Sequence, residues 1–141
     1  MCDARSQLAE WFKDLWGEPL PEDGDTDLFD RFGIEGDDAG EFIESFVAHF
    51  QVDAQNYRWY FHHQDEGTNF GALLFTPIYR RVERLPITPN LLIAAIETQQ
   101  WPIKYPPHHI PPVRWDIRVN QLSFAVAIIV LGIWLWQRFV P

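Results

Sequence analysis

The sequence predicts an all-α protein, in which a small helical bundle is followed by a proline-rich stalk and one C-terminal transmembrane helix. Apolar residues recur at helical spacing through the first part of the chain, and five prolines follow within residues 102–113. A run of 19 residues without a charge then separates Arg118 from Arg138. The expected boundaries are 1–101 for the helical domain, 102–117 for the linker and 118–139 for the transmembrane helix.

The first expected helix begins after Asp3, whose carboxylate can cap it, and ends at Gly17. Its apolar residues recur at i, i+3, i+4, i+7 and i+8, which places them on one buried stripe. A short helical turn should follow an acidic loop, with Thr26 as its cap and Gly33 at its end. The stripe consists of Leu8, Trp11, Phe12, Leu15 and Trp16.

A second long helix is expected over residues 39–50. Asp38 stands at the N-cap position, and Glu41 follows three residues later, as in a capping box. The apolar residues again lie at helical spacing, so this helix should bury one face. That face consists of Ala39, Phe42, Ile43, Phe46, Val47 and Phe50.

Residues 52–84 show no clear period, and we assign no regular element there. A last helix of the domain is expected over 89–99, because Thr88 is a good N-cap and Pro89 suits the first helical position. Trp101 should close this helix against the core. The prolines that follow exclude a helix and favour an extended spacer of at most about 35 Å.

The uncharged run near the C-terminus spans about 28 Å as a helix, close to the thickness of a hydrocarbon core. Trp115, Trp134 and Trp136 stand where interfacial aromatic residues lie. A buried core helix is the alternative, since the strictly apolar part, residues 122–136, is shorter. We favour a spanning helix because the segment has no polar face for solvent.

The distribution of basic residues predicts the orientation of this helix. Lys104, Arg114 and Arg118 precede it, whereas only Arg138 follows, so the positive-inside rule places the domain in the cytoplasm. The N-terminus opens into a charged amphipathic stretch without the apolar run of a signal peptide. We therefore expect a single-pass, tail-anchored protein.

Charge is divided unequally along the chain. Residues 1–66 carry 17 acidic and four basic residues (net −13), and residues 67–141 carry three acidic and seven basic residues (net +4). An acidic domain is repelled by phosphates, so we expect no nucleic-acid partner, whereas a basic protein suits it. The basic second part suits anionic headgroups of a lipid bilayer. The single cysteine, Cys2, excludes an internal disulfide and favours a reducing compartment.

No pattern indicates catalysis, a cofactor or a metal. Asp23, Asp25 and Asp27 resemble the start of a calcium loop, but the glycine and the bidentate glutamate of that loop are missing. The paired histidines, His62-His63 and His108-His109, do not easily bind one metal ion, because adjacent residues in extended backbone point to opposite sides. We expect them to be surface histidines. Potential nucleophiles lie at a terminus, within helices or in the tail, so we expect no enzyme.

Acidic residues follow the face of the second long helix opposite its apolar face. Asp37, Glu41 and Glu44 lie at i, i+4 and i+7, and Asp38 is adjacent. Such a stripe serves either plain solvation or the docking of a basic protein surface. We take these four carboxylates as the candidate partner-binding residues.

The segment from Thr26 to Asp53 resembles an acyl carrier protein around its second helix, but without the serine that carries the prosthetic group. It is more similar to a bacterial family, domain of unknown function 1493, whose Gly-Asp-Asp-Ala motif matches residues 36–39. Later parts of that family's pattern are similar to residues 70–74 and 86–101, with a departure at Gln99-Gln100. The resemblance covers about residues 3–101 and implies an acyl-carrier-like helical bundle of a bacterial protein, without a known activity. The linker and the transmembrane helix lie outside it, and together with the basic flanks they lead us to expect a bacterial inner membrane location.

Three hypotheses for function remain. The first is a non-catalytic docking or regulatory module that presents its acidic helix at the membrane and has no phosphopantetheine. The second is an atypical carrier protein that is modified at another position. The third is a small membrane protein whose tail acts in membrane stress or helix pairing while the domain regulates it.

Overall fold

The computed structural model describes residues 3–140. Helices and short 3-10 turns form its regular elements, and within the described residues the bridge between Asp53 and Gln100 is isolated, so no sheet forms. The predicted all-α fold is confirmed. Contacts divide the chain into two compact units: unit 1 is Met1–Glu66 with Glu83–Pro107, and unit 2 is Gly67–Val82 with His108–Pro141.

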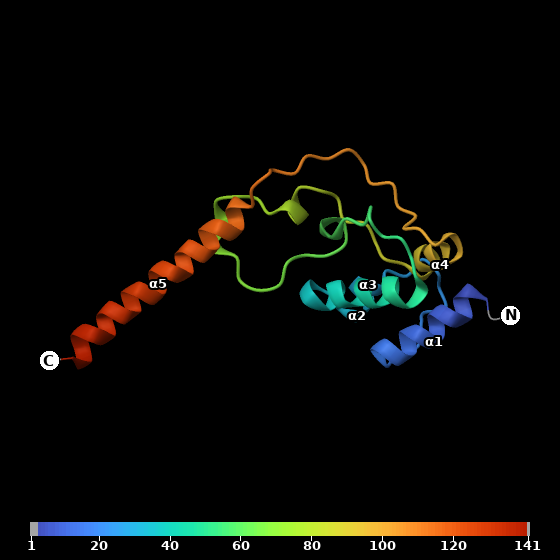
Figure 1. The fold of residues 1–141 in the computed structure, drawn as a ribbon, viewed down its shortest axis with the longest axis horizontal. Coiled ribbons are helices and arrows are strands. Elements are labelled where there is room, and N and C mark those ends of the chain that lie inside the picture. Colours follow the sequence, from blue (N-terminus) through green and yellow to red (C-terminus); the bar gives the residue numbers. More distant parts are fainter. Residues whose placement is uncertain (1–2, 141) are drawn as a thin grey trace. The chain divides into compact units, whose positions relative to one another are not determined.

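Four α-helices and one 3-10 turn build unit 1, and one long helix with two 3-10 turns builds unit 2 (Figure 1). The elements of unit 1 are α1 (Ala4–Trp16), α2 (Leu28–Phe32), α3 (Gly36–Phe50), η1 (Trp59–Phe61) and α4 (Pro89–Thr98). Those of unit 2 are η2 (Phe70–Leu73), η3 (Ile78–Arg80) and α5 (Trp115–Phe139).

The ends of α1 and α4 follow local sequence rules. The Asp3 carboxylate accepts hydrogen bonds from the first amides of α1, and Gly17 ends that helix in the left-handed conformation at φ 80°. Thr88 Oγ1 accepts from the Leu91 amide at 3.2 Å and caps α4, with Pro89 in the first helical position. These predicted caps are confirmed because each depends only on neighbouring residues.

Two other predicted caps are wrong. Asp27, and not Thr26, caps α2, with its Oδ1 accepting from the amides of Phe29 and Asp30. Helix α3 begins at Gly36 after Glu35, so Asp38 is not its N-cap and forms no capping box with Glu41. Gly36, the first residue of α3, takes a positive φ of 55°, which glycine adopts without strain. Asp38 therefore lies in the first turn, where its charge suits the helix dipole.

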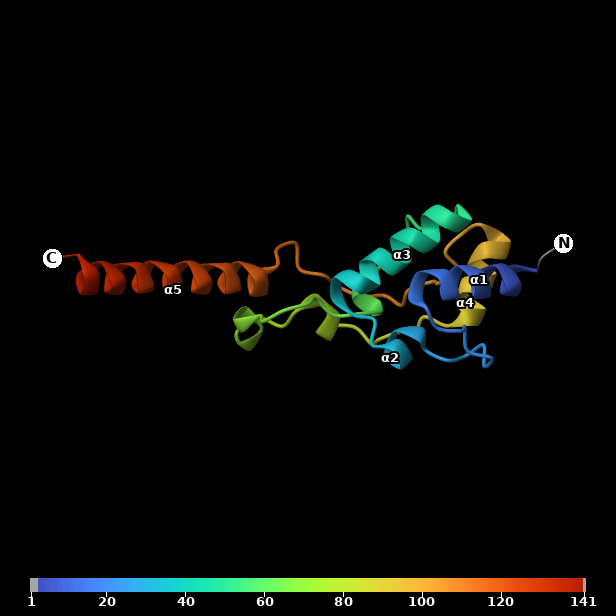
Figure 2. The same cartoon turned by 90° about the horizontal axis from the view of Figure 1, so that it is seen from below.

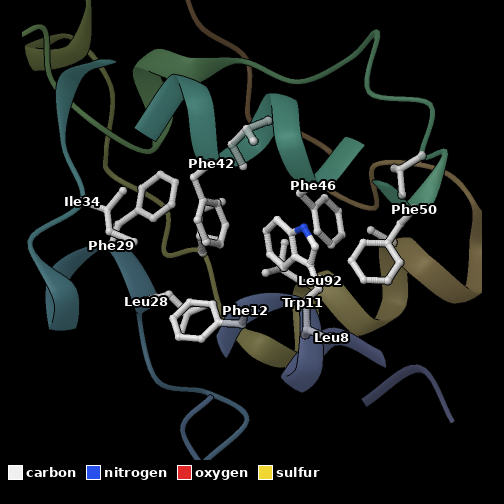
Figure 3. Packing of buried hydrophobic residues seen from close by; sticks show 14 of the residues in the cluster. Leu8, Trp11, Phe12, Leu28, Phe29, Ile34, Phe42, Phe46, Phe50 and Leu92 are labelled. Carbon is white, nitrogen blue, oxygen red and sulfur yellow. The ribbon is translucent and has the colours of Figure 1, made fainter. Parts of the chain in front are cut away.

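The core of unit 1 is built from aromatic side chains on α1 and α3. Figure 3 shows Trp11 of α1 lying against three phenylalanines of α3. Its ring centroid is 5.2 Å from that of Phe42, 5.6 Å from Phe46 and 5.7 Å from Phe50. Helices α1 and α4 contact each other (Figure 2), and Leu92 of α4 is fully buried in the same core. The apolar residues that recur at helical spacing on α1, α3 and α4 thus pack together in one aromatic core.

The ends of α3 and α4 are joined by backbone and side-chain hydrogen bonds. The Asp53 amide donates to Gln99 O at 2.9 Å, and the Trp101 amide donates to Asp53 O at 2.9 Å. Gln99 takes a left-handed conformation (φ 57°), and its Nε2 donates to Phe50 O at 3.0 Å and Ile96 O at 2.8 Å. Gln99 therefore caps the ends of α3 and α4 at once.

The first part of the proline-rich segment differs from the expected free spacer. Residues 102–107 belong to unit 1, and Tyr105 packs there with its ring 4.8 Å from that of Phe61. Trp101 Nε1 donates to the Tyr105 hydroxyl at 2.9 Å. The prolines exclude a helix, but they do not prevent an aromatic side chain between them from packing.

Unit 2 contains a helix that is long and apolar enough to cross a membrane. Helix α5 has 25 residues, or about 37 Å at the helical rise, and begins at Trp115 rather than at 118. Side chains from Gln121 to Val140 are exposed, so the alternative of a buried core helix is not supported within this chain. Residues 67–82, which we expected in the helical domain, belong to the same compact unit as α5.

Candidate acidic groove

The four acidic residues predicted for partner binding are all exposed on α3, but they do not share one surface. Asp37, Glu41 and Glu44 line a groove of about 560 Å³. Asp38 instead lines a smaller hollow of about 270 Å³ together with Glu41 and the end of α1. Consecutive helical residues are about 100° apart, so Asp38 points away from Asp37. We call the larger hollow the acidic groove.

The acidic groove has a second wall that sequence analysis did not predict. From α3 it is lined by Gly36, Asp37, Gly40, Glu41, Ile43 and Glu44. From the segment around η1 it is lined by Tyr57, Trp59, His63, Gln64, Asp65 and Glu66. This segment lies in the stretch without a helical period, and its paired acids, Asp65 and Glu66, were the one signal available in the sequence.

Two contacts hold the second wall against the beginning of α3. Glu35 Oε2 accepts a hydrogen bond from the Gln64 amide at 3.0 Å. A Cβ atom built on Gly36 would lie 2.5 Å from Glu66 Cβ, a distance that side chains do not tolerate. Glycine at position 36 is therefore required both by its positive φ and by the close approach of Glu66. The close approach of the two walls of the groove therefore depends on a glycine at position 36.

The groove combines negative charge with aromatic surface. Asp37, Glu41, Glu44, Asp65 and Glu66 bring five carboxylates to it, and none of its described lining residues is Lys or Arg. Tyr57 and Trp59 add aromatic rings, which attract cations through their faces. Such a surface favours ammonium and guanidinium groups and repels phosphates.

Two polar atoms beside the groove are buried without a hydrogen-bond partner, His63 Nε2 and Tyr57 Oη. The other ring nitrogen of His63 lies 3.1 Å from Gln64 O, and a carbonyl only accepts, so Nδ1 carries the hydrogen in that bond. In the neutral ring Nε2 is then an acceptor. Burial without a partner is costly for both atoms.

The expectation that His62 and His63 lie at the surface is wrong. His62 is fully buried, and His63 is 8% exposed. His62 Nδ1 donates to Leu85 O at 2.8 Å, and its Nε2 accepts from the Tyr105 hydroxyl at 2.8 Å. The Tyr57 ring stacks on the His62 ring with centroids 5.3 Å apart. The buried network fixes the position of Tyr57, one of the groove's aromatic residues.

Burial lowers the pKa of His62 to about 4 in the folded chain, below its ordinary value of 6.5. Between these values the unfolded chain binds one more proton than the folded chain. The free energy of unfolding should therefore decrease as the pH falls through this window, and be about 2 kcal/mol lower at pH 5 than at pH 7. Chemical unfolding of the full chain in detergent micelles at both pH values measures this difference.

A His62→Gln variant should lose this component of the pH dependence, and His109→Gln, at an exposed position, should keep it. An equal change with pH in wild type and His62→Gln would contradict the assignment to His62.

The aspartates considered for calcium have structural roles in the described chain. Asp23 Oδ1 accepts from the Asp25 amide at 3.0 Å, and Asp25 Oδ1 accepts from Asn90 Nδ2 at 3.0 Å. Asp27 caps α2 and pairs with Arg84. Within residues 3–140, no group of three or more His, Asp or Glu residues is placed to hold a metal ion. The predictions concerning Cys2 lie outside the described residues.

In comparisons with known proteins, no protein-family model, no curated protein and no solved structure matches the chain.

Proposed function

We propose that the chain is a non-catalytic, membrane-anchored docking module, in which α5 crosses a bilayer and the acidic groove receives a basic segment of a partner protein. The single observation that carries this proposal is the meeting of five carboxylates in one groove whose described lining includes no Lys or Arg. A basic segment would neutralise these charges.

The resemblance to acyl carrier proteins supports the same proposal. Carrier proteins resemble this chain around α3, where residues 36–39 replace the serine-containing motif. Residues 34–44 contain no hydroxyl side chain, so the beginning of α3 offers no attachment atom for phosphopantetheine. The module would therefore use a carrier-like surface for docking, without a prosthetic group.

For the location of the module we propose a single-pass protein of a bacterial inner membrane with its domain in the cytoplasm. The support is the excess of basic residues before α5, where Lys104, Arg114 and Arg118 precede the apolar segment and Arg138 follows it. A cytoplasmic position also agrees with a partner that is itself a basic cytoplasmic protein.

Neutralising the α3 wall of the groove tests the docking proposal. Replacing Asp37 by Asn and both Glu41 and Glu44 by Gln should weaken binding of a fluorescent arginine-rich peptide by roughly 10-fold, because three exposed charges at about 0.5 kcal/mol each contribute about 1.5 kcal/mol in all. The full chain in nanodiscs of zwitterionic lipid is titrated with the peptide, and fluorescence anisotropy gives Kd. The difference should shrink as salt is raised, since surface charges are screened.

A matched control distinguishes the effect of the groove carboxylates from the effect of the protein's net charge. The triple variant Glu10→Gln, Asp14→Asn and Glu18→Gln removes the same charge from exposed positions on and next to α1. This control should weaken peptide binding far less than the groove variant. Equal losses in the two variants would mean that the α3 carboxylates serve solvation and that the peptide responds to overall charge.

A tail exchange tests the competing hypothesis that α5 itself performs the function. If α5 only anchors, a chain in which residues 122–136 are replaced by an unrelated apolar spanning segment should bind the peptide with unchanged Kd. Loss of binding, with membrane insertion retained, would favour a specific role of the tail.

A further inference from the structure

Unit 2 exposes a short apolar loop outside α5. Residues 70–75, which we call the apolar loop, contain the η2 turn and four large apolar side chains. Their exposed fractions are 51% for Phe70, 84% for Leu73, 74% for Leu74 and 40% for Phe75. Single exposed leucines are common on protein surfaces, but neighbouring exposed side chains of this size form a continuous apolar patch. Such patches mark interaction sites.

Polar side chains hold the apolar loop against the beginning of α5. The Phe70 amide donates to Asn120 Oδ1 at 2.8 Å, and Asn120 Nδ2 donates to Thr68 O at 3.0 Å. Asn69 Nδ2 donates to Asp116 Oδ2 at 3.0 Å. Asn69 and Asn120 therefore fix the loop at the first two turns of the helix. Figure 1 shows the backbone of this green loop beside the start of α5.

Gly71 allows the backbones to approach directly. It is buried, and a Cβ atom built on it would lie 1.8 Å from Asp116 O and 2.7 Å from Asp116 C. No flexible side chain stands between them, so any other residue at position 71 would push the loop away from α5. The Phe70 ring meets that of Phe124 at 5.9 Å, within the apolar part of the helix. The apolar loop is thus continuous with the apolar surface of α5.

Three backbone amides of the apolar loop donate within the loop or to the residue before it. The Leu74 and Phe75 amides donate to Gly71 O at 3.0 Å and 2.8 Å. The Ala72 amide donates to the backbone O of Asn69 at 3.2 Å. Polar backbone groups without a partner are costly in lipid, so these three bonds lower the cost of bringing the loop into the interfacial layer.

We propose that the apolar loop is inserted into the interfacial layer of the same bilayer that α5 crosses, on the side of the helix's N-terminus. The inference rests on the proposed membrane anchoring. Its position fits, since Asn120 lies just before the apolar run of residues 122–136, where the membrane boundary falls. Arg80 and Arg81 follow the loop, and Arg118 lies 5.4 Å from the Trp115 ring, so cations and an aromatic side chain stand at headgroup level.

We take lipid as the partner of the apolar loop, because the exposed side chains of the loop are continuous with the apolar surface of α5. The loop's exposed side chains adjoin a helix whose side chains are exposed over its whole apolar length, and both belong to one compact unit. A bilayer that surrounds α5 therefore meets the loop. The loop gives unit 2 a second contact with the membrane and limits rotation of α5 relative to the bilayer surface.

Depth-dependent fluorescence quenching tests this inference. Cys2 is the single cysteine, so a Cys2→Ser background permits a nitrobenzoxadiazole label at one new cysteine in the full chain. The label is placed in turn at Leu74→Cys, at Ile129→Cys in the middle of α5 and at Ala48→Cys, an exposed position of unit 1. Each protein is inserted into vesicles of phosphatidylethanolamine and phosphatidylglycerol that contain a spin label either high or low on the acyl chain.

The expected pattern distinguishes the inference from the anchoring on which it rests. The label at 74 should lose fluorescence mainly to the shallow quencher, the label at 129 mainly to the deep one, and the label at 48 to neither. No quenching at 129 would overturn the membrane anchor and the inference with it. Quenching at 129 without quenching at 74 would overturn the inference alone. A label at 74 that is shielded from both quenchers and responds to protein density would assign the patch to a second copy of the chain.

A second variant tests the attachment of the loop to α5. Gly71→Ala should displace the loop, so the label at 74 should lose its preference for the shallow quencher while the label at 129 keeps its own. An unchanged pattern at 74 would show that the close approach to Asp116 does not set the depth of the loop.

Discussion

Replacing Ile129 and Val130 together by Asp is expected to abolish stable membrane insertion of the chain. Each ionised Asp near the centre of a spanning helix costs about 2.5–3.5 kcal/mol, so the pair costs about 5–7 kcal/mol. Both side chains are exposed at 60% along α5, so no neighbouring group in the chain offers a partner that would offset this cost. Extraction of cell membranes with alkaline carbonate measures the effect as a shift of the full chain from the pellet to the supernatant.

The matched control replaces the same two residues by Leu, which keeps the length and apolar character of α5. This variant should remain in the carbonate-washed membranes like the wild type. If the double Asp variant also remains there, α5 does not cross the bilayer and the proposed anchoring is wrong.

The second large effect is expected at Phe42, the residue at which three helices of unit 1 meet. Its ring lies 5.2 Å from Trp11 and 6.1 Å from Phe12 of α1, and 5.5 Å from Phe29 of α2. Phe42→Ala should lower the free energy of unfolding by about 3–5 kcal/mol, because the side chain is 1% exposed and its removal leaves a cavity between packed rings. Near-UV circular dichroism during chemical unfolding of the full chain in micelles measures the loss.

Glu44→Ala serves as the control for this variant, since Glu44 lies on the same helix but is exposed. It should change the free energy of unfolding by about 0.5 kcal/mol or less. A Phe42→Ala protein as stable as the wild type would mean that the aromatic core of Figure 3 does not hold α1, α2 and α3 together.

Half of the acidic groove could be predicted from sequence. Asp37, Glu41 and Glu44 were placed correctly on one exposed surface because helical spacing fixes which residues share a face. Asp38 was grouped with them by adjacency, and the rotation of the helix directs it to another hollow. The partner-binding role of all four residues stays a prediction.

The other half of the groove could not be predicted, since residues 57–66 have no period that local rules recognise. Their conformation is set by bonds to distant parts of the chain. The Leu85 amide donates to Phe61 O at 2.6 Å, and Tyr105 holds His62 from 43 residues away. Aromatic side chains can pack in many arrangements, so the distant residues that contact residues 57–66 determine which arrangement forms.

The sequence by itself determined the features that depend on near neighbours: the helical period of α1, α3 and α4, the caps at Asp3 and Thr88, and the presence of an apolar C-terminal helix. Only the tertiary structure decided that Tyr105 packs between prolines, that His62 and His63 are buried, and that residues 67–82 join α5. The physical reason is the range of the interactions. A helix and its caps form from bonds between residues at most a few positions apart. The groove and the apolar loop instead form where a glycine leaves room for a distant residue: Gly36 for the Glu66 side chain, and Gly71 for the Asp116 backbone.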